Sequence, residues 1–479
     1  MIDKKTDALF KEWVKNNKNR ILDKWIKLAE IPSIRSEAQN GAPFGIYCAE
    51  ALRTAASYFS SEAIKSEVFA DDGYALAHFG NGEKTIGLFS HSDVVPVGDD
   101  WLYTKPFEPI IKDGVLIGRG VEDNKSGIMA SLCVMEFLRD CNIPFENHLQ
   151  LFIGSDEECG MGDMKGFLKN QKMPEISIVP DADFPCSKGE KGIYHFMIES
   201  KKAFSDVKSV NGGEAFNIVL DNVTAEINYS SELLSELSDK ITPELSLAYN
   251  EESIIITAKG IAKHASIPEG SVNAALLMFN LLSECDNINY NDRKILKNAA
   301  EAIHDYYGNG IGITHTDPEF GKMTAVNGMV RTNEGKLRLS FDVRYGSTLD
   351  AELLEKTADE SIDSLGFTVI SKDNSPGFAI EEDSPIAGIF EDIFAEATGE
   401  RLNSVLMAGG TYARKLKNAF SIGTYYISPE RRDTVLKMPD GHGGAHQCDE
   451  MIDIDGFFEA TRILLHYILA CDRYLSESN

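Results

Sequence analysis

Acidic and histidine side chains follow four apolar, strand-like runs of this sequence. The runs are 85–90, 115–118, 149–154 and 176–179, and the residues that follow them are His91 with Asp93, Asp123, Glu157 with Glu158, and Asp181. Strand ends gather at one edge of an α/β sheet, so we expect these side chains to lie close together. A single acid in such a place is more often a helix cap, a turn residue or part of a solvated acidic patch. Four successive strand ends, with a histidine at the first and adjacent glutamates at the third, favour a metal cluster instead.

The elements that must position these residues alternate between strands and helices. Helical patterns cover 5–30 and 128–139, and the second of these lies between the second and third strand-like runs. This alternation predicts an α/β sheet covered on both faces. Helical sequence returns at 386–397 and 454–468, so the end of the chain is expected to complete the same layer.

The middle of the chain has a different pattern. The run 253–258 is β-branched, an amphipathic helix starts at Asn273, and 336–345 alternates between apolar and polar residues. The alternation predicts a strand buried on one face only, typical of an antiparallel α+β layer, with a polar face made of Arg338, Ser340, Asp342 and Arg344.

A chain of 479 residues is too long for one ordinary core. We therefore predict an α/β fold class with two domains, a mixed-sheet α/β domain and an α+β domain inserted into it. The first consists of 1–186 and 385–479, and the second of 187–384.

The overall charge argues against two classes of partner. With 47 basic and 75 acidic residues, the net charge of -28 repels nucleic acid and anionic membranes.

The first 19 residues have no apolar signal-peptide region, and no stretch approaches the roughly 20 apolar residues of a membrane span. Eight cysteines are scattered singly, which suits reduced thiols, so we expect a cytoplasmic protein.

A series of motifs between residues 80 and 450 resembles a known family. The motifs are "HSDVVPVGDDW", "PFEPIIKDGVLIGRGVEDNKSG", "GSDEECGMGDMK", "PDADFPCSKGEKG", "AFNIVLDN", "KHASIPEGSVNA", "DVRY", "GGTYAR" and "HQCDE". Together they resemble the dinuclear zinc exopeptidases that include carnosinase, aminoacylase and glutamate carboxypeptidase. Within that family the likeness is closest to the bacterial dipeptidase PepV type.

The resemblance implies two zinc ions per subunit, with manganese or cobalt as alternatives. It makes His91, Asp123 and Asp181 the ligands of one ion, and Asp123, Glu158 and His446 those of the other. Glu157 would be the general base that takes a proton from the attacking water, and Asp93 would orient His91. His442, four positions before His446, is a competing candidate ligand.

The resemblance makes the domain of 1–186 and 385–479 the mixed-sheet α/β catalytic domain and the domain of 187–384 an inserted α+β lid domain. It also implies roles for residues that bind the substrate. His264 resembles the imidazole that stabilises the oxyanion of the reaction, although a lone histidine is more often structural. Arg344 resembles the residue that pairs with the substrate's terminal carboxylate, with help from Asn217, although a solvated arginine is commonplace on a polar strand face. Gly409 and Gly410 would let a loop pack close to that carboxylate.

The predicted function is metal-dependent hydrolysis of the amide bond of unblocked dipeptides. The large lid resembles the type that supplies its own histidine, so we expect a monomer that acts on small peptides. One alternative is an N-acyl amino acid deacylase or desuccinylase with the same metals. An alternative of another class is a metal-binding protein without catalysis, which would have no use for Glu157.

Overall fold

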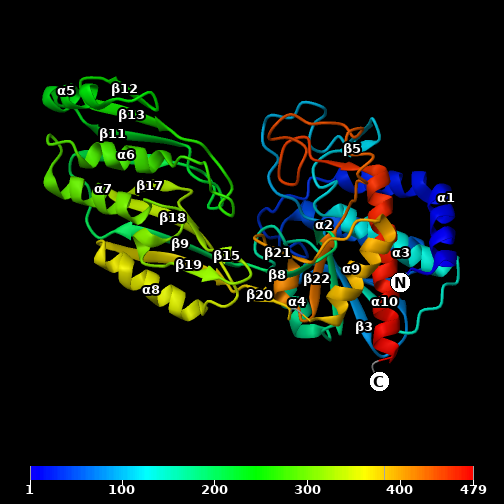
Figure 1. The fold of residues 1–479 in the computed structure, drawn as a ribbon. Coiled ribbons are helices and arrows are strands. Elements are labelled where there is room, and N and C mark those ends of the chain that lie inside the picture. The colour runs from blue at the N-terminus through cyan, green and yellow to red at the C-terminus, as the bar shows by residue number, and fades with distance from the viewer. Residues whose placement is uncertain (1, 382, 478–479) are drawn as a thin grey trace. The chain divides into compact units, whose positions relative to one another are not determined.

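The chain divides into two compact units in this computed structural model, which describes residues 2–381 and 383–477. Unit 1 consists of Met1–Gly189, Ile380–Val405 and Thr411–Asn479, and unit 2 of Glu190–Ala379 and Leu406–Gly410. Unit 2 is thus inserted between segments of unit 1 in the sequence. Figure 1 labels many of the elements of both units. That unit 2 acts as a lid stays a prediction.

A mixed sheet forms the centre of unit 1. Its strands follow the order β1-β2-β6-β3-β7-β22-β8. The inner strands β6, β3, β7 and β22 run parallel, and the outer neighbours β1, β2 and β8 pair antiparallel. The predicted mixed α/β fold class is confirmed. The bounds are β1 Lys65–Phe69, β2 Tyr74–Gly80, β3 Thr85–His91, β6 His148–Gly154, β7 Ile176–Ala182, β8 Ser187–Glu190 and β22 Ala419–Gly423.

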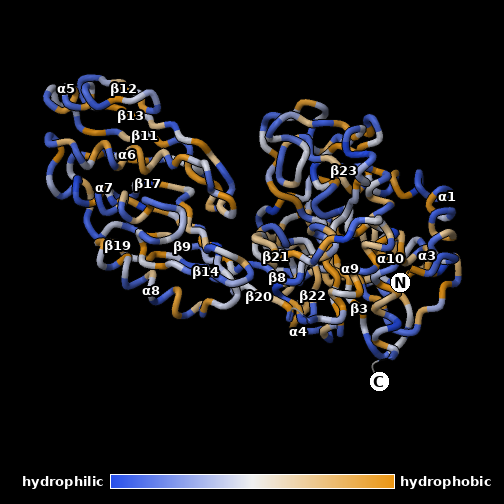
Figure 2. Tube along the Cα trace, viewed as in Figure 1, coloured by the Kyte–Doolittle hydropathy of each residue, from blue (hydrophilic) through white to orange (hydrophobic). Residues whose placement is uncertain are grey.

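Long helices from both ends of the chain bury their apolar faces in the core of unit 1. Trp25 is fully buried, with its ring centroid 4.3 Å from that of Phe457, and Phe390 stacks on Tyr467 at 4.0 Å. In Figure 2 the apolar residues concentrate around β3, β22, α9 and α10. The helices are α1 Lys4–Ala29, α2 Ile46–Ser61, α3 Lys125–Asp140, α4 Met164–Asn170, α9 Pro385–Thr398 and α10 Ile454–Glu477.

No helix in the part of the chain that the structure describes has the length and apolar composition needed to cross a bilayer.

One of the four predicted strand ends belongs to another sheet. The strand β5 (Val115–Ile117) pairs with β4 (Ile110–Lys112) and β23 (Met451–Asp453) in a three-stranded sheet, so the prediction that all four ends share one sheet is wrong for Asp123. Part of the reason is the pairing with the distant strand β23, and part of it is local. Asp113 and Gly114 both have positive φ, of 50° and 82°, and form the two-residue turn that closes a β4–β5 hairpin.

Unit 2 is built on an antiparallel sheet of order β12-β13-β11-β10-β17-β18-β9-β19, with β16 beside β18. The strands are β9 Gly192–Ser200, β10 Val207–Gly212, β11 Asn222–Asn228, β12 Leu245–Tyr249, β13 Ser253–Lys259, β16 Thr324–Val326, β17 Val330–Asn333, β18 Lys336–Tyr345 and β19 Phe367–Ser375. The helices are α5 Ser231–Lys240, α6 Ala274–Ser283, α7 Tyr290–Ala302 and α8 Ala351–Ser364.

The strand β18 has the predicted bounds but not the predicted solvent-exposed face. From Leu339 onward every residue is buried, including Ser340, Asp342 and Arg344. The strand lies inside the sheet, between β17 and β9, and its polar side chains find partners there. Ser340, for example, accepts a hydrogen bond from the backbone of Met329 at 2.8 Å. The alternation of apolar and polar residues in β18 therefore reflects two buried faces that differ in polarity, and not one buried and one solvent-exposed face.

Candidate metal centre

Five of the predicted ligands lie together in unit 1, in two groups whose donor atoms are all within 4.8 Å of one another. His91 ends β3, and Asp181 lies near the end of the neighbouring strand β7. Glu158 follows β6, Asp123 precedes α3, and His446 precedes β23. The groups are His91, Asp123 and Asp181, and Asp123, Glu158 and His446.

Asp123 is the residue common to both groups. Its Oδ1 lies 3.1 Å from Nε2 of His91, while its Oδ2 lies 3.1 Å from Nε2 of His446. On the outer side of each group, Asp181 Oδ2 is 3.7 Å from His91 Nε2, and Glu158 Oε2 is 3.1 Å from His446 Nε2. The two carboxylate oxygens of Asp123 thus face different imidazoles, as a carboxylate bridging two ions requires.

The donor set fits bound cations because ordinary hydrogen bonds leave it incomplete. Nδ1 of His91 is 3.0 Å from the carbonyl oxygen of Asp93, so the Nε2 lone pair is directed at the carboxylates. Among the described residues, buried His91 Nε2 and Glu158 Oε1 have no hydrogen-bond partner with acceptable geometry. Buried polar atoms are nearly always satisfied, so these atoms point to a cation as the missing partner.

The electrostatics of the cluster point the same way. Burial, reinforced by the charge of Asp123, raises the pKa of Asp181 to about 8 and also raises the pKa of Glu158. Hydrogen bonding to Asp123 and Glu158 raises the pKa of His446 to about 11. So many acids in one buried place need added positive charge to be ionised together at neutral pH.

Glu157 lies beside the two groups and belongs to neither. Its Oε1 is buried and has no hydrogen-bond partner among the described residues, and burial raises its pKa well above the usual range. The carboxylate of Asp93 accepts the backbone N–H groups of Glu157 and Glu158, each at 3.2 Å. Asp93 therefore holds the Glu157–Glu158 turn with its side chain and His91 with its carbonyl. Its carboxylate is farther from His91 Nδ1, at 3.5 Å.

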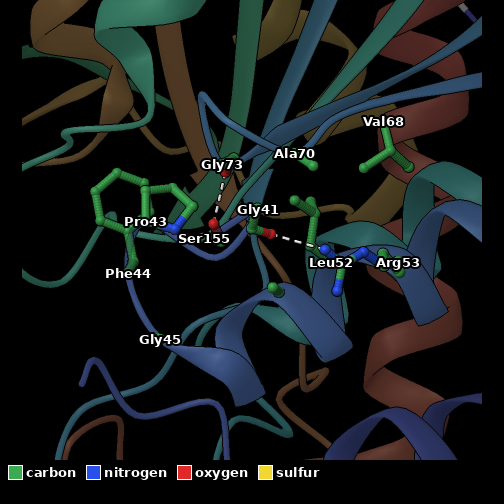
Figure 3. A pocket seen from close by; sticks show the side chains of 11 residues that line it. Gly41, Pro43, Phe44, Gly45, Leu52, Arg53, Val68, Ala70, Gly73 and Ser155 are labelled. Atoms are coloured by element: carbon green, nitrogen blue, oxygen red, sulfur yellow. Dashed lines mark hydrogen bonds between the residues drawn. The ribbon is translucent and has the colours of Figure 1, made fainter. Parts of the chain in front are cut away.

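The turn that carries Glu157 is also anchored by residues that the sequence analysis did not identify. Oδ2 of Asp163 accepts the backbone N–H of Ser155 and of Asp156, and the hydroxyl of Tyr412 at 2.6 Å. Ser155 Oγ donates to the carbonyl of Gly73, as Figure 3 shows, beside a hollow too small to admit a ligand. The sequence signals that could have identified these two residues are the aspartate that ends "GMGD" and the tyrosine within "GGTYAR".

The structure separates the two candidate histidines near the end of the chain. His446 belongs to the second group of donor atoms, whereas Nδ1 of His442 lies 2.7 Å from Oδ2 of Asp449. That aspartate also accepts the backbone N–H groups of Leu102 and Tyr103. His442 therefore belongs to the packing of a loop and not to the cluster.

The remaining predicted site residues lie in unit 2. Ala265 donates its backbone N–H to the carbonyl of Asn217, and His264 pairs with Ile218 in an isolated bridge, so Asn217 and His264 lie on adjacent segments. His264 is exposed, and its Nδ1 lies 2.7 Å from Oγ of Ser266.

Arg344 and the glycine loop also meet inside unit 2. Nη1 of Arg344 lies 3.3 Å from the carbonyl oxygen of Ala408, which directly precedes Gly409 and Gly410. A Cβ on Gly409 would lie 3.7 Å from the nearest side-chain atom, on Met407. The local packing therefore does not demand a glycine at position 409.

Comparisons with known proteins identify the family of this chain. The model of "Peptidase family M20/M25/M40" matches residues 87–470. The Bacillus subtilis (strain 168) protein named "Putative dipeptidase YtjP" is 28% identical over 406 residues, covering 82% of this chain and 84% of that protein. The Staphylococcus aureus (strain USA300) protein named "Putative dipeptidase SAUSA300_1697" is 25% identical over 480 residues, covering 96% of this chain and 98% of that protein.

Solved structures share the fold. The crystal structure of human carnosine dipeptidase 1 has a TM-score of 0.61 and 13% identity, covering 98% of this chain and 99% of that one. A tripeptidase from Staphylococcus aureus has a TM-score of 0.57 and 16% identity, covering 95% and 99%.

Proposed function

The chain belongs to peptidase family M20/M25/M40, and we propose that it is a dinuclear metallodipeptidase that hydrolyses the amide bond of unblocked dipeptides. The observation that carries the proposal is the position of Asp123, with one carboxylate oxygen in each group of donor atoms. His91 and Asp181 complete one metal site, and Glu158 and His446 the other. The mixed imidazole and carboxylate ligands suit zinc, and also manganese or cobalt.

Two divalent ions at these residues would polarise the scissile carbonyl and make the attacking water more acidic. The chain's own residues then move the protons. Glu157 takes a proton from the water and delivers it to the leaving amine, for which its buried, otherwise unbonded Oε1 is suited. Asp93 keeps Glu157 in reach through its hydrogen bond to the Glu157 backbone N–H.

Arg344 would bind the terminal carboxylate of the substrate. Asp342 accepts Arg344 Nε at 2.6 Å and Nη2 at 2.8 Å, and it also lies 2.9 Å from Nε2 of His195. Burial alone would raise the pKa of Asp342, but hydrogen bonds from His195 and Arg344 lower it to about 2, so this carboxylate stays charged. The contacts to Asp342 and Ala408 use three of the five N–H groups of Arg344 and leave one on each terminal nitrogen for a carboxylate.

The other unit 2 residues take the supporting roles. His264 would stabilise the oxyanion, Asn217 would assist Arg344, and the Gly409–Gly410 segment would line the carboxylate site. The preference for dipeptides is supported by the names of the relatives and by that of carnosine dipeptidase. All eight cysteines are free, which suits the cytoplasm, and we expect a monomer, to be tested by light scattering.

Glu157→Gln tests the proposal most directly. The variant should keep two metal ions per chain, measured by elemental analysis, because Glu157 belongs to neither group of donor atoms. Its rate of amino-acid release from a dipeptide panel should fall about 10²- to 10⁴-fold, the usual contribution of a general base. Loss of metal together with activity would mean that Glu157 is a ligand and not the base.

N-acetylated dipeptides and N-acyl amino acids provide the substrate control. A dipeptidase that requires a free amine should leave them intact. Faster cleavage of the acylated compounds would assign the chain to the deacylases, and normal metal binding without any hydrolysis would make it a metal-binding protein.

A further inference from the structure

Glu450, four residues after His446, is fully buried, and its carboxylate accepts four hydrogen bonds from the segment that leads to Asp123. Oε2 accepts Nη1 of Arg119 at 2.8 Å and the backbone N–H of Gly120 at 2.9 Å. Oε1 accepts the backbone N–H groups of Glu122 at 2.8 Å and of Asp123 at 3.1 Å. The Glu450 side chain thus binds the segment 119–123, which ends at the shared ligand Asp123.

The partner of Glu450 reaches back to the other metal-binding segment. Arg119 is also buried, and its Nη2 lies 3.4 Å from the carbonyl oxygen of His446 and 3.3 Å from that of Pro96. Its guanidinium lies over the ring of Trp101 at 5.6 Å. The Arg119–Glu450 ion pair therefore joins two segments that are far apart in the sequence, one carrying Asp123 and the other His446.

The small sheet of unit 1 brings these segments together but does not fix their ligands. Its strands β5 and β23 pair directly, and the N–H of Gly118 donates to the carbonyl of Glu450 at 2.9 Å. His446 lies outside the strands, has a φ of 64°, and keeps 53% of its side chain exposed. Beyond its contacts with Asp123 and Glu158, the position of this exposed imidazole depends on its own backbone, which Arg119 reaches at the carbonyl oxygen of His446.

We propose that Glu450 is a positioning residue that sets Asp123 and His446 at the spacing a shared pair of cations needs. It acts through the Asp123 backbone N–H and through Arg119, and it touches neither substrate nor cation. The inference rests on the proposed metal centre. It adds the residue that holds the segment carrying Asp123 against the segment carrying His446. Mutation of residues that orient metal ligands in this way typically lowers metal affinity 10- to 100-fold.

A residue with the same local chemistry offers a matched control. Asp472 is also buried and accepts the backbone N–H groups of Glu146 and Asn147. These residues precede β6, whereas Glu158 follows the other end of that strand. Asp472→Asn therefore removes a comparable buried carboxylate from the same unit without disturbing the cluster.

The experiment titrates the metal-free full-length protein with Co²⁺ or Zn²⁺ by calorimetry, alongside thermal unfolding of each variant. Wild type should bind two ions. In Glu450→Gln the amide nitrogen must face either Arg119 and Gly120 or the donors of Glu122 and Asp123. At least one of the two ions should therefore bind at least about tenfold more weakly than in wild type. Asp472→Asn should lose thermal stability yet bind both ions within threefold of wild type. Arg119→Lys keeps the charge but not the reach to His446, and should show a milder loss in a folded protein even if Glu450→Gln does not fold.

The outcomes separate this inference from the proposed function. If wild type binds two ions and both Glu450→Gln and Arg119→Lys bind them within threefold of wild type, Glu450 is only structural and the metal centre stands. Equal weakening in Asp472→Asn would also overturn the inference, because general loss of stability would then explain it. A wild-type protein that binds no ions would instead refute the proposed function.

Discussion

The proposed metal centre of unit 1 and the Arg344 cluster of unit 2 both combine aspartate with histidine, but the charge of the aspartate is balanced differently in each. Around Asp123, the buried atoms His91 Nε2, Glu157 Oε1 and Glu158 Oε1 have no hydrogen-bond partner among the described residues. In unit 2, Asp342 is satisfied by Arg344 and His195. The first arrangement needs an added cation and the second is neutralised from within, so we expect chemistry at the first and recognition at the second.

Removing Asp123 should produce the largest change, because both sites depend on it. Asp123→Ala should bind neither ion tightly and should lose activity by about a thousandfold or more, since the metal contribution is several kcal/mol. Elemental analysis and dipeptide hydrolysis measure the two effects. Retention of both ions at wild-type affinity would break the comparison, because Asp123 would then be no shared ligand.

Arg344 should affect binding more than turnover. Arg344→Ala should raise KM about 10- to 100-fold, as expected for lost hydrogen bonds to a charged group, with a smaller change in kcat and unchanged metal content. Arg344→Lys should lie between, because it keeps the charge but not the planar fork.

Arg338 gives a control on the same strand, since it pairs with Glu199 on the neighbouring strand β9. Arg338→Ala should leave KM within twofold of wild type. An equal rise of KM in both variants would show that damage to β18, and not loss of the carboxylate site, is responsible.

The smallest effect should be an acid-dependent loss of stability in unit 2. Asp342 has a folded-state pKa of about 2 against an ordinary value of 3.8. A depressed carboxyl pKa stabilises the fold above pH 4, and this stabilisation is lost as the pH falls toward 2. The shift corresponds to about 2 kcal/mol. Acid unfolding followed by circular dichroism should show a shallower pH dependence in Asp342→Asn than in wild type.

The sequence predicted most of the elements that carry the metal centre. The strands that end near His91, Glu158 and Asp181 could be located because each is a continuous apolar run followed by polar residues, as buried parallel strands are. The roles of these residues as ligands stay predictions, although the structure brings their donor atoms together.

The errors came from contacts between distant segments. The Asp113–Gly114 turn is a local signal for a hairpin of β4 and β5. The apolar run of β5 nevertheless resembled a further strand of the main sheet. Its sheet is decided by pairing with β23, more than 300 residues later in the chain. The polar face of β18 read as solvated, because the pattern cannot show that a second set of partners covers it.

By itself the sequence determined the chemistry available to this protein. The residue types and their places after apolar runs indicated a metal cluster, because repeated capping does not require a histidine and paired glutamates at successive strand ends. The resemblance of the motifs to a known family then indicated a hydrolase. Only the tertiary structure decided which of those groups meet. Whether His446 or His442 joins Asp123, and whether Glu450 lies behind them, depends on pairing between segments far apart in the chain. That pairing is fixed by buried hydrogen bonds and packing, which leave no periodic trace in the sequence.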